Sequence, residues 1–162
     1  MKILNYSNDF TYSEIEQLIS LLPKCFQNLN IEIIFPKNKW HCLKWIYLRE
    51  YFKNIKGIYK STIGGSSCIH YPKVFIYSFN YDLYGEYGEI GKLRCVQTFY
   101  HEIRHQWQRE NDKTMFDKYN LNKEYKRNIP YEEQWHEIDA KKFSSAIMNG
   151  NIKKIKSILN LL

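Results

Sequence analysis

The chain has 162 residues, of which 44% are hydrophobic and 17% aromatic. This composition excludes an intrinsically disordered protein and predicts a single globular domain over residues 1–162. The N-terminus shows no signal-peptide pattern and no apolar run is long enough to span a membrane, so we expect a cytoplasmic protein with no membrane partner.

The net charge of +7 comes from lysines and arginines that are distributed along the whole sequence. Such a charge would attract nucleic acid, but no nucleic-acid-binding motif accompanies it, so we interpret it as a solvated basic surface. The four cysteines have no C-x-x-C spacing and are predicted to be reduced and mostly buried. The sequence makes no prediction of the oligomeric state.

The N-terminal part of the chain is predicted to form a helix followed by a strand. Apolar residues at helical spacing predict an amphipathic helix over residues 12–28, capped by Thr11 or Ser13 and kinked or divided at Pro23. The β-branched and apolar residues 31–35 predict a strand that ends at the next proline.

The middle of the chain alternates between apolar segments and turn residues. A second helix or helical turn is predicted over residues 40–52. Further strands are expected at residues 57–63, 68–71 and 74–79, with a turn at residues 64–67 and a bend at Pro72.

The second half of the chain is predicted to be mainly helical. A glycine-containing loop at residues 80–91 leads to a helix from Lys92, whose apolar stripe is Leu93, Val96, Tyr100, Ile103 and Trp107. A polar connector at residues 111–128 follows, then a helix over residues 132–148, a stop at residues 149–151 and a last helix over residues 152–162.

The helix that begins at Lys92 carries the H-E-x-x-H pattern as His101-Glu102-Ile103-Arg104-His105. Positions i and i+4 of a helix lie on one face, so both imidazoles can bind one metal ion while Glu102 acts on a metal-bound water. The histidines lie on a different side from the apolar stripe, so metal binding and packing do not compete for positions. The pattern also arises by chance, and His101 would then be a packed helix residue and His105 a surface one.

A metal site of this kind needs a third protein ligand. The carboxylate-rich helix that follows within about 30 residues of the pattern offers several candidates, which are Glu132, Glu133, His136, Glu137 and Asp139.

The segment Glu137-Ile138-Asp139-Ala140-Lys141-Lys142-Phe143 resembles the acidic segment of the small zinc peptidases of the ImmA/IrrE and related minigluzincin families. The resemblance covers roughly residues 58–147, and its specific parts are this segment and the H-E-x-x-H pattern. It implies that Zn²⁺ is held by His101, His105 and Glu137, with Glu102 as the general base.

The resemblance also implies that Ala140 and Phe143 are packing positions, as in those families. Two features depart from related patterns. No third histidine follows His105, so the three-histidine site of the metzincins and of some SprT-type proteins is not supported, and Lys141 stands where the family often has Asn or Asp.

Several roles in the acidic segment remain open at this point. A thermolysin-like order would make Glu133 the third ligand and Glu137 its supporting carboxylate. Tyr131 and His136 are candidates for stabilising an oxyanion, and Asp139 for orienting a ligand imidazole, although each would also suit an ordinary helix residue.

These observations predict an α+β fold of the zincin type, in which a small twisted sheet packs on the motif helix and a second helix supplies Glu137. The predicted function is zinc-dependent hydrolysis of peptide bonds in a protein or peptide substrate, which would add to a sheet edge formed by the strand around residues 68–79. The alternatives are a catalytically inactive zinc-binding or protein-interaction module and a basic protein that associates with nucleic acid.

Overall fold

The computed structural model describes residues 1–45, 56–58, 60, 63–68, 71–85, 87–112 and 128–161. Its strands and helices are β1 (Lys2–Asn5), α1 (Tyr12–Ser20), α2 (Lys24–Gln27), β2 (Glu32–Phe35), the 3₁₀ helix η1 (His41–Trp45), β3 (Gly65–Ser67), β4 (Lys73–Ile76), the 3₁₀ helix η2 (Ser78–Asn80), α4 (Gly88–Asn111), the 3₁₀ helix η3 (Tyr131–Glu133) and α7 (Trp135–Ile158).

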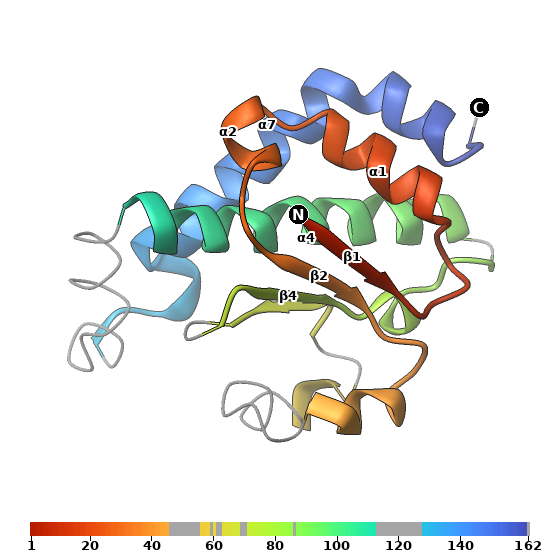
Figure 1. Ribbon diagram of the computed structural model, residues 1–162, viewed down its shortest axis with the longest axis horizontal. Coiled ribbons are helices and arrows are strands. Elements are labelled where there is room, and N and C mark those ends of the chain that lie inside the picture. Colours follow the sequence, from red (N-terminus) through yellow and green to blue (C-terminus); the bar gives the residue numbers. More distant parts are fainter. Residues whose placement is uncertain are drawn as a thin grey trace.

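The four strands form one mixed sheet in the order β1-β2-β4-β3 (Figure 1). β1 and β2 are parallel, β2 and β4 are parallel, and β3 runs antiparallel to β4. α1 makes the crossover that two neighbouring parallel strands such as β1 and β2 require. With α4 packed on this sheet and α7 packed on α4, the predicted α+β architecture is confirmed.

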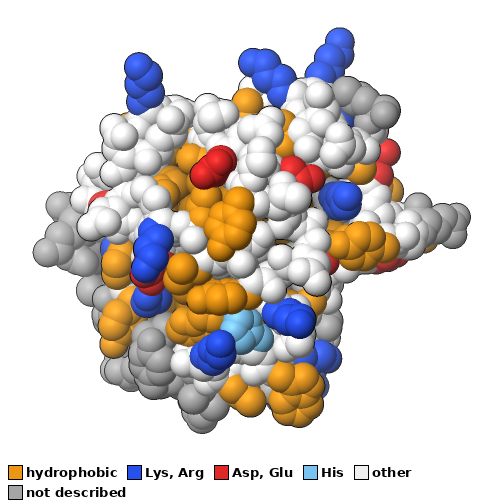
Figure 2. Space-filling view, turned by 45° about the vertical axis from the view of Figure 1, so that its right-hand side comes forward, with side chains coloured by type: hydrophobic (Ala, Val, Ile, Leu, Met, Phe, Trp, Pro, Cys, Tyr) orange, Lys and Arg blue, Asp and Glu red, His pale blue; other side chains and the backbone are white. Residues whose placement is uncertain are grey.

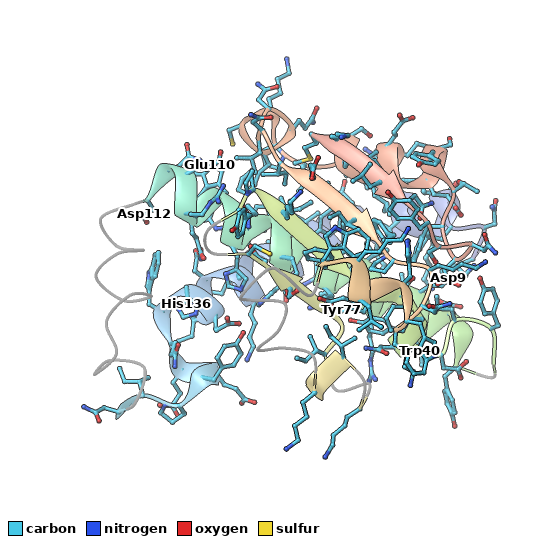
Figure 3. The ribbon with its side chains drawn as sticks, turned by 60° about the horizontal axis from the view of Figure 1, so that its bottom comes forward. Asp9, Trp40, Tyr77, Glu110, Asp112 and His136 are labelled. Carbon is cyan, nitrogen blue, oxygen red and sulfur yellow. The ribbon has the colours of Figure 1, made fainter. Side chains whose placement is uncertain are left out.

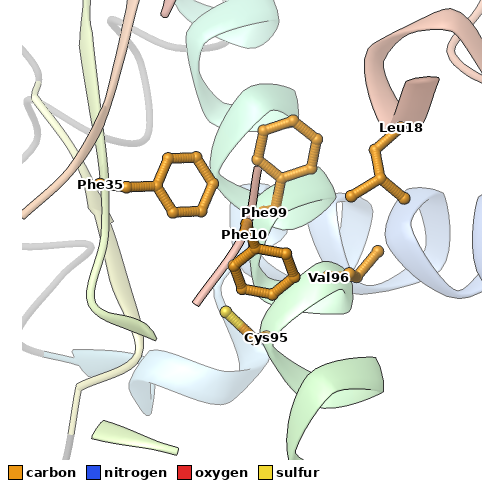
Figure 4. Close-up of a pocket in the computed structure, with 6 residues that line it drawn as sticks. All are labelled: Phe10, Leu18, Phe35, Cys95, Val96 and Phe99. Atoms are coloured by element: carbon orange, nitrogen blue, oxygen red, sulfur yellow. The ribbon is translucent and has the colours of Figure 1, made fainter. Parts of the chain in front are cut away.

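Alternate residues of the strands face two apolar clusters. Ile33 of β2 and Val74 of β4 join the larger cluster, which lies under α1, α4 and α7. Their neighbours Ile34 and Phe75 face the other side of the sheet, where Trp45 of η1 packs against them. Figure 4 shows part of the larger cluster, where six side chains from α1, α4, β2 and the loop after β1 meet: Phe10, Leu18, Phe35, Cys95, Val96 and Phe99.

α4 is the long helix between the sheet and α7 (Figure 1). Its expected apolar stripe is confirmed, since every member of the stripe is buried in, or packed against, the larger cluster. The helix begins at Gly88 and not at Lys92. The glycines that we interpreted as loop residues allow its first turn to lie close against the main chain of the preceding segment. A Cβ atom on Gly91 would lie only 1.7 Å from the carbonyl oxygen of Asp82.

The predictions for the first helix and strand are confirmed. The helix divides at Pro23 into α1 and α2, and residues 31–35 contain β2. Of the two candidate caps, Thr11 is the N-cap, and it forms a capping box with Glu14.

Several predictions for the middle of the chain are wrong. β1 was not expected, and none of the described residues of the segment 57–63 lies in a strand, since residues 57 and 58 are helical. The expected turn at residues 64–67 contains the strand β3, and the strand expected at residues 74–79 ends at Ile76. Cys68 and Tyr71 also lie outside strands. The helix or helical turn predicted over residues 40–52 is confirmed in its described part, where His41–Trp45 form a 3₁₀ helix. Residues 46–52, 59, 61–62 and 69–70 lie outside the described residues.

The expectation that the strand around residues 68–79 forms the sheet edge is also wrong. β4 lies inside the sheet, between β2 and β3. Among the described strands it is β3 that lies at the edge next to α4.

α7 is one helix where two were predicted. It continues through Gly150 to Ile158, although a glycine in a helix interior costs about 1 kcal/mol relative to alanine. Met148 before Gly150 and Ile155 after it are both buried in the larger cluster, so tertiary packing outweighs the local signal. The helix starts at Trp135 and not at residue 132, because residues 131–133 form η3; most of the expected connector, residues 113–127, lies outside the described residues.

The described surface agrees with a distributed basic charge. On the face that Figure 2 shows, Lys and Arg side chains are spread among apolar and acidic ones. None of the described helices is long and apolar enough to cross a membrane. The four cysteines are free thiols, of which Cys25 is exposed and the other three are buried.

Candidate metal centre

Two helices bring the candidate ligands together. His101 and His105 lie one turn apart on α4, and Glu137 lies in the first turn of α7, which packs along α4. Among the described residues, these three form the group of His, Cys, Asp and Glu side chains that could hold a metal ion, with ligand atoms within 4.8 Å of one another. The segments are 32 or more residues apart in sequence, so the tertiary packing creates the site.

The distances between the three side chains match a small tetrahedral site. The Nε2 atoms of His101 and His105 are 3.0 Å apart, and they lie 3.1 and 3.3 Å from the two carboxylate oxygens of Glu137. Ligands bound tetrahedrally to zinc at about 2.0–2.1 Å lie about 3.3 Å from one another. The three residues therefore fit a zinc ion, and imidazole and carboxylate are ligands that zinc accepts.

Hydrogen bonds outweigh burial and favour the charged form of Glu137. Burial alone would raise the pKa of the Glu137 carboxyl, but the hydrogen bonds with His101 and His105 and the charge of His105 hold that pKa well below its usual range. Burial lowers the pKa of His105, yet the hydrogen bond with Glu137 and the charge of Glu102 outweigh this effect and raise the pKa to about 9. The site thus pairs the Glu137 carboxylate with a protonated imidazole, and a metal ion that binds there replaces that proton.

Glu102 is buried beside the three candidate ligands. Burial raises the pKa of its carboxyl above the ordinary value, the two histidines oppose this shift, and Glu137 adds to it. A carboxyl with a raised pKa is suited to accept and return a proton near neutral pH. The strand β3 lies directly against it, because a Cβ atom on Gly65 would be 2.9 Å from the Glu102 Cγ.

The packing positions that the resemblance implies hold α7 against α4. Ala140 is fully buried, and the ring of Phe143 stacks on Phe26 of α2 at a centroid distance of 4.4 Å. The guanidinium of Arg104 lies 4.2 Å from the ring centroid of Trp107 and 5.3 Å from that of Phe143. These contacts set the relative position of the two helices that carry the ligands.

The other candidates from the acidic segment lie at different places around the site. His136, which Figure 3 labels, is buried on α7, and its Nε2 lies 3.4 Å from the Glu137 carboxylate. Tyr131 is mostly exposed on η3, with its ring centroid 6.4 Å from that of His136. Asp139 bonds to Arg104 and not to a histidine. Glu133 is exposed on η3 and is not part of the group of three, and neither is Glu132.

Sequence reasoning missed Gln108, which is fully buried and whose side-chain oxygen lies 2.9 Å from His105 Nδ1. The available signal was its spacing, since position i+3 from His105 lies on the same helix face. A polar residue at that spacing is common on exposed helices. The spacing therefore indicates a partner of His105 only once the residue is known to be buried against α7.

Comparison with known proteins returns no relative. No protein-family model, no curated protein and no solved structure matches this chain.

Proposed function

We propose that the protein is a zinc-dependent metallopeptidase whose metal ligands are His101, His105 and Glu137. The observation that carries the proposal is the meeting of two Nε2 atoms and a carboxylate at 3.0–3.3 Å, with the buried Glu102 between the two histidines in sequence. Three protein ligands leave a fourth position for water, as in catalytic zinc sites, whereas structural sites are closed by four ligands.

The chemistry of the proposed reaction is hydrolysis of an amide bond. Zinc, when bound, polarises the substrate carbonyl and lowers the pKa of a water molecule. Glu102 accepts a proton from the attacking water as its oxygen forms a bond to the carbonyl carbon. The same carboxyl then delivers that proton to the leaving nitrogen as the C–N bond breaks, so the side chain returns to its starting state.

Tyr131 is the proposed donor to the oxyanion that develops on the carbonyl oxygen. Its side chain lies at the edge of the site, where its ring packs edge-on against that of His136. A donor that is held at the site before reaction stabilises developing negative charge without reorganisation. His136, whose Nε2 lies near Glu137, is the second candidate for this role.

The proposed substrate is an extended peptide that adds to β3. Support comes from the place of β3 at the edge of the described sheet and from its close approach to Glu102. Strand addition supplies main-chain hydrogen bonds, which give affinity without demanding a particular side chain. A peptide held there would place its amide groups beside the general base.

Metal analysis of the purified protein tests the ligand set. The parent, purified without chelators, should carry stoichiometric zinc, and Glu137→Ala or the isosteric Glu137→Gln should lose it. Glu133→Ala is the matched control, because it removes an exposed carboxylate from the same region and should leave the zinc content unchanged. Zinc retained in both Glu137 variants, or lost in the Glu133 variant, would contradict the assignment, as would a parent that holds another metal or none.

Glu102→Gln separates a peptidase from an inactive zinc-binding module. The variant should keep its zinc and lose about 10²–10⁴-fold in cleavage of a disordered protein such as casein, because only proton transfer is removed. A parent that binds zinc and leaves such substrates and peptide libraries intact would favour the binding module.

A further inference from the structure

We infer that Gln108 is a positioning residue that orients His105 and determines which of its ring nitrogens faces the metal. This inference rests on the proposed metal centre. Gln108 is fully buried on α4, one turn after His105, and its Oε1 lies 2.9 Å from the Nδ1 atom of that ring. His105 Nε2, the opposite ring atom, is the one that lies 3.0 Å from His101 Nε2.

The orientation of the Gln108 amide follows from its other partners. Its Nε2 lies 3.0 Å from the main-chain carbonyl oxygen of His136 and 2.6 Å from the Asp139 carboxylate. Both partners are acceptors only, so the amide nitrogen must face them, and the reversed amide would place its oxygen against two oxygens. The amide oxygen is therefore held on the side of His105.

This orientation selects one form of the His105 ring. An amide oxygen accepts and cannot donate, so His105 Nδ1 must carry the proton in the 2.9 Å contact. In the neutral ring the lone pair then belongs to Nε2, which points to His101 and Glu137. A metal-ligating histidine is commonly held through its other ring nitrogen by a carboxylate or carbonyl group, and here a side-chain amide takes that place.

Asp139 and Arg104 hold the amide in turn. Arg104 donates from Nε and Nη2 to the two carboxylate oxygens of Asp139, at 2.7 and 3.1 Å. The guanidinium is itself stacked against Trp107 and Phe143. A bidentate ion pair with one member packed on aromatic rings is a rigid support, so the chain Arg104–Asp139–Gln108–His105 joins the packed interface between the helices to the metal ligand.

Gln106 provides a matched control on the same helix. It is equally buried, and its amide nitrogen donates to the Ser67 hydroxyl and, at 2.9 Å, to the carbonyl oxygen of Cys68. It thus ties α4 to the end of β3, and none of its hydrogen bonds involves a metal-ligand candidate. Gln106→Met and Gln108→Met each remove one buried amide from α4 at nearly constant volume.

The experiment measures the zinc dissociation constant by competition with a chromophoric chelator and the melting temperature of the metal-free protein. Gln108→Met should raise the zinc dissociation constant about 10–100-fold, while Gln106→Met should leave it within about threefold of the parent.

The outcomes distinguish this inference from the proposed function. A zinc-binding parent with unchanged affinity in Gln108→Met overturns the role of Gln108 alone, and equal weakening in the two Met variants overturns it as well. If Gln108→Met does not fold, nitrogen-15 NMR of the His105 ring in the zinc-bound parent decides, because a proton on Nδ1 with zinc at Nε2 supports the inference and zinc bound at Nδ1 overturns it. A parent that binds no zinc overturns the metal centre and this inference with it.

Discussion

The two sides of α4 differ in how their residues are held. On the core side, Phe99 and Val96 touch apolar side chains from several other elements (Figure 4). On the ligand side, His105 is held through Gln108, and Gln108 through Asp139. Apolar contacts are numerous and non-directional, whereas each hydrogen bond in that chain has one required geometry.

This difference separates stability from function on a single helix. Loss of a core side chain removes many small contacts at once and lowers the free energy of unfolding. Loss of one member of the polar chain leaves the helix packed but releases a ligand. We therefore expect core-side variants to change stability at nearly constant zinc affinity, and ligand-side variants to do the reverse.

The largest expected effect on stability is that of Phe99→Ala. The side chain is 2% exposed and central to the larger cluster, so truncation should lower the free energy of unfolding by about 3–5 kcal/mol. Urea denaturation of the metal-free protein measures the loss. Ile90→Ala, on the same helix but half exposed, should cost less than about 1 kcal/mol.

The folded fraction of Phe99→Ala should bind zinc as the parent does. A zinc dissociation constant that rises in step with the loss of stability, measured where the variant is fully folded, would show that the two sides of the helix are not independent.

The two sides of α4 were also predictable to different degrees. The 3.6-residue period separates Val96, Tyr100 and Ile103 from His101 and His105, so both the buried stripe and the histidine pair follow from the local sequence. Local pattern predicts which face is apolar because that pattern is repeated along the helix. It cannot predict Gln108 as a partner of His105, because the burial of that amide depends on α7, 28 residues further on.

The same limit explains the strands that the sequence did not indicate. β3 consists of Gly65-Ser66-Ser67, which are turn residues by composition. It is a strand because it pairs with β4, where Ser67 lies opposite Val74, and because it lies against α4. β1 has only four residues and is held by parallel pairing with β2. In both cases pairing with the partner strand determines the structure, and the sequence of a short segment does not show which strand it will pair with.

The next largest effect is expected where the ligand side of α4 meets β3. A methyl group on Gly65 would lie 2.7 Å from Thr98 Cγ2 and 2.9 Å from Glu102 Cγ, so Gly65→Ala should lower the free energy of unfolding by about 1–3 kcal/mol. It should also reduce cleavage, because the strand or the Glu102 side chain must move. Gly150→Ala is the control: nothing lies within 4 Å of the added Cβ, and helix propensity should stabilise the protein by about 0.5–1 kcal/mol.

Urea denaturation and a cleavage assay of both alanine variants test this pair. Equal stability changes of the same sign in the two variants would contradict the tight contact at Gly65.

A smaller effect is the pH dependence of zinc binding. The hydrogen bond with Glu137 and the charge of Glu102 overcome burial and raise the pKa of His105 to about 9, so zinc must displace a proton at neutral pH. Zinc affinity should therefore rise about tenfold, or about 1.4 kcal/mol, per pH unit up to pH 9 and then level off. Competition titrations at pH 6.5, 7.5 and 8.5, corrected for the chelator, measure the slope.

The metal-free protein should show the opposite trend. A pKa that is raised by folding contributes stability that is fully present below the ordinary value of 6.5 and is lost as the pH rises through 9. Zinc affinity that does not change between pH 6.5 and 8.5 would contradict a protonated His105 in the metal-free site.

The smallest effect is expected for Asp139→Asn, which keeps the shape of the side chain and removes its charge. Burial raises the pKa of Asp139, but the hydrogen bonds from Arg104 and Gln108 outweigh it and lower the pKa below its ordinary value of 3.8. The carboxylate is partly exposed, which screens the ion pair, so we expect the free energy of unfolding to fall by about 1 kcal/mol or less at pH 7.

The pH dependence tests whether the charge of Asp139 matters. A pKa that is lowered by folding contributes stability that is present above the ordinary value and is lost as the pH falls through the folded value. The difference between the parent and Asp139→Asn should therefore stay constant from pH 7 to pH 5 and shrink below about pH 3.8, which urea unfolding of the metal-free proteins at about pH 7, 5, 3.5 and 2.5 measures. A difference that stays constant over this range would mean that Asp139 acts through its shape and its hydrogen bonds alone, and the charge of the Arg104–Asp139 pair would then have no part in holding Gln108.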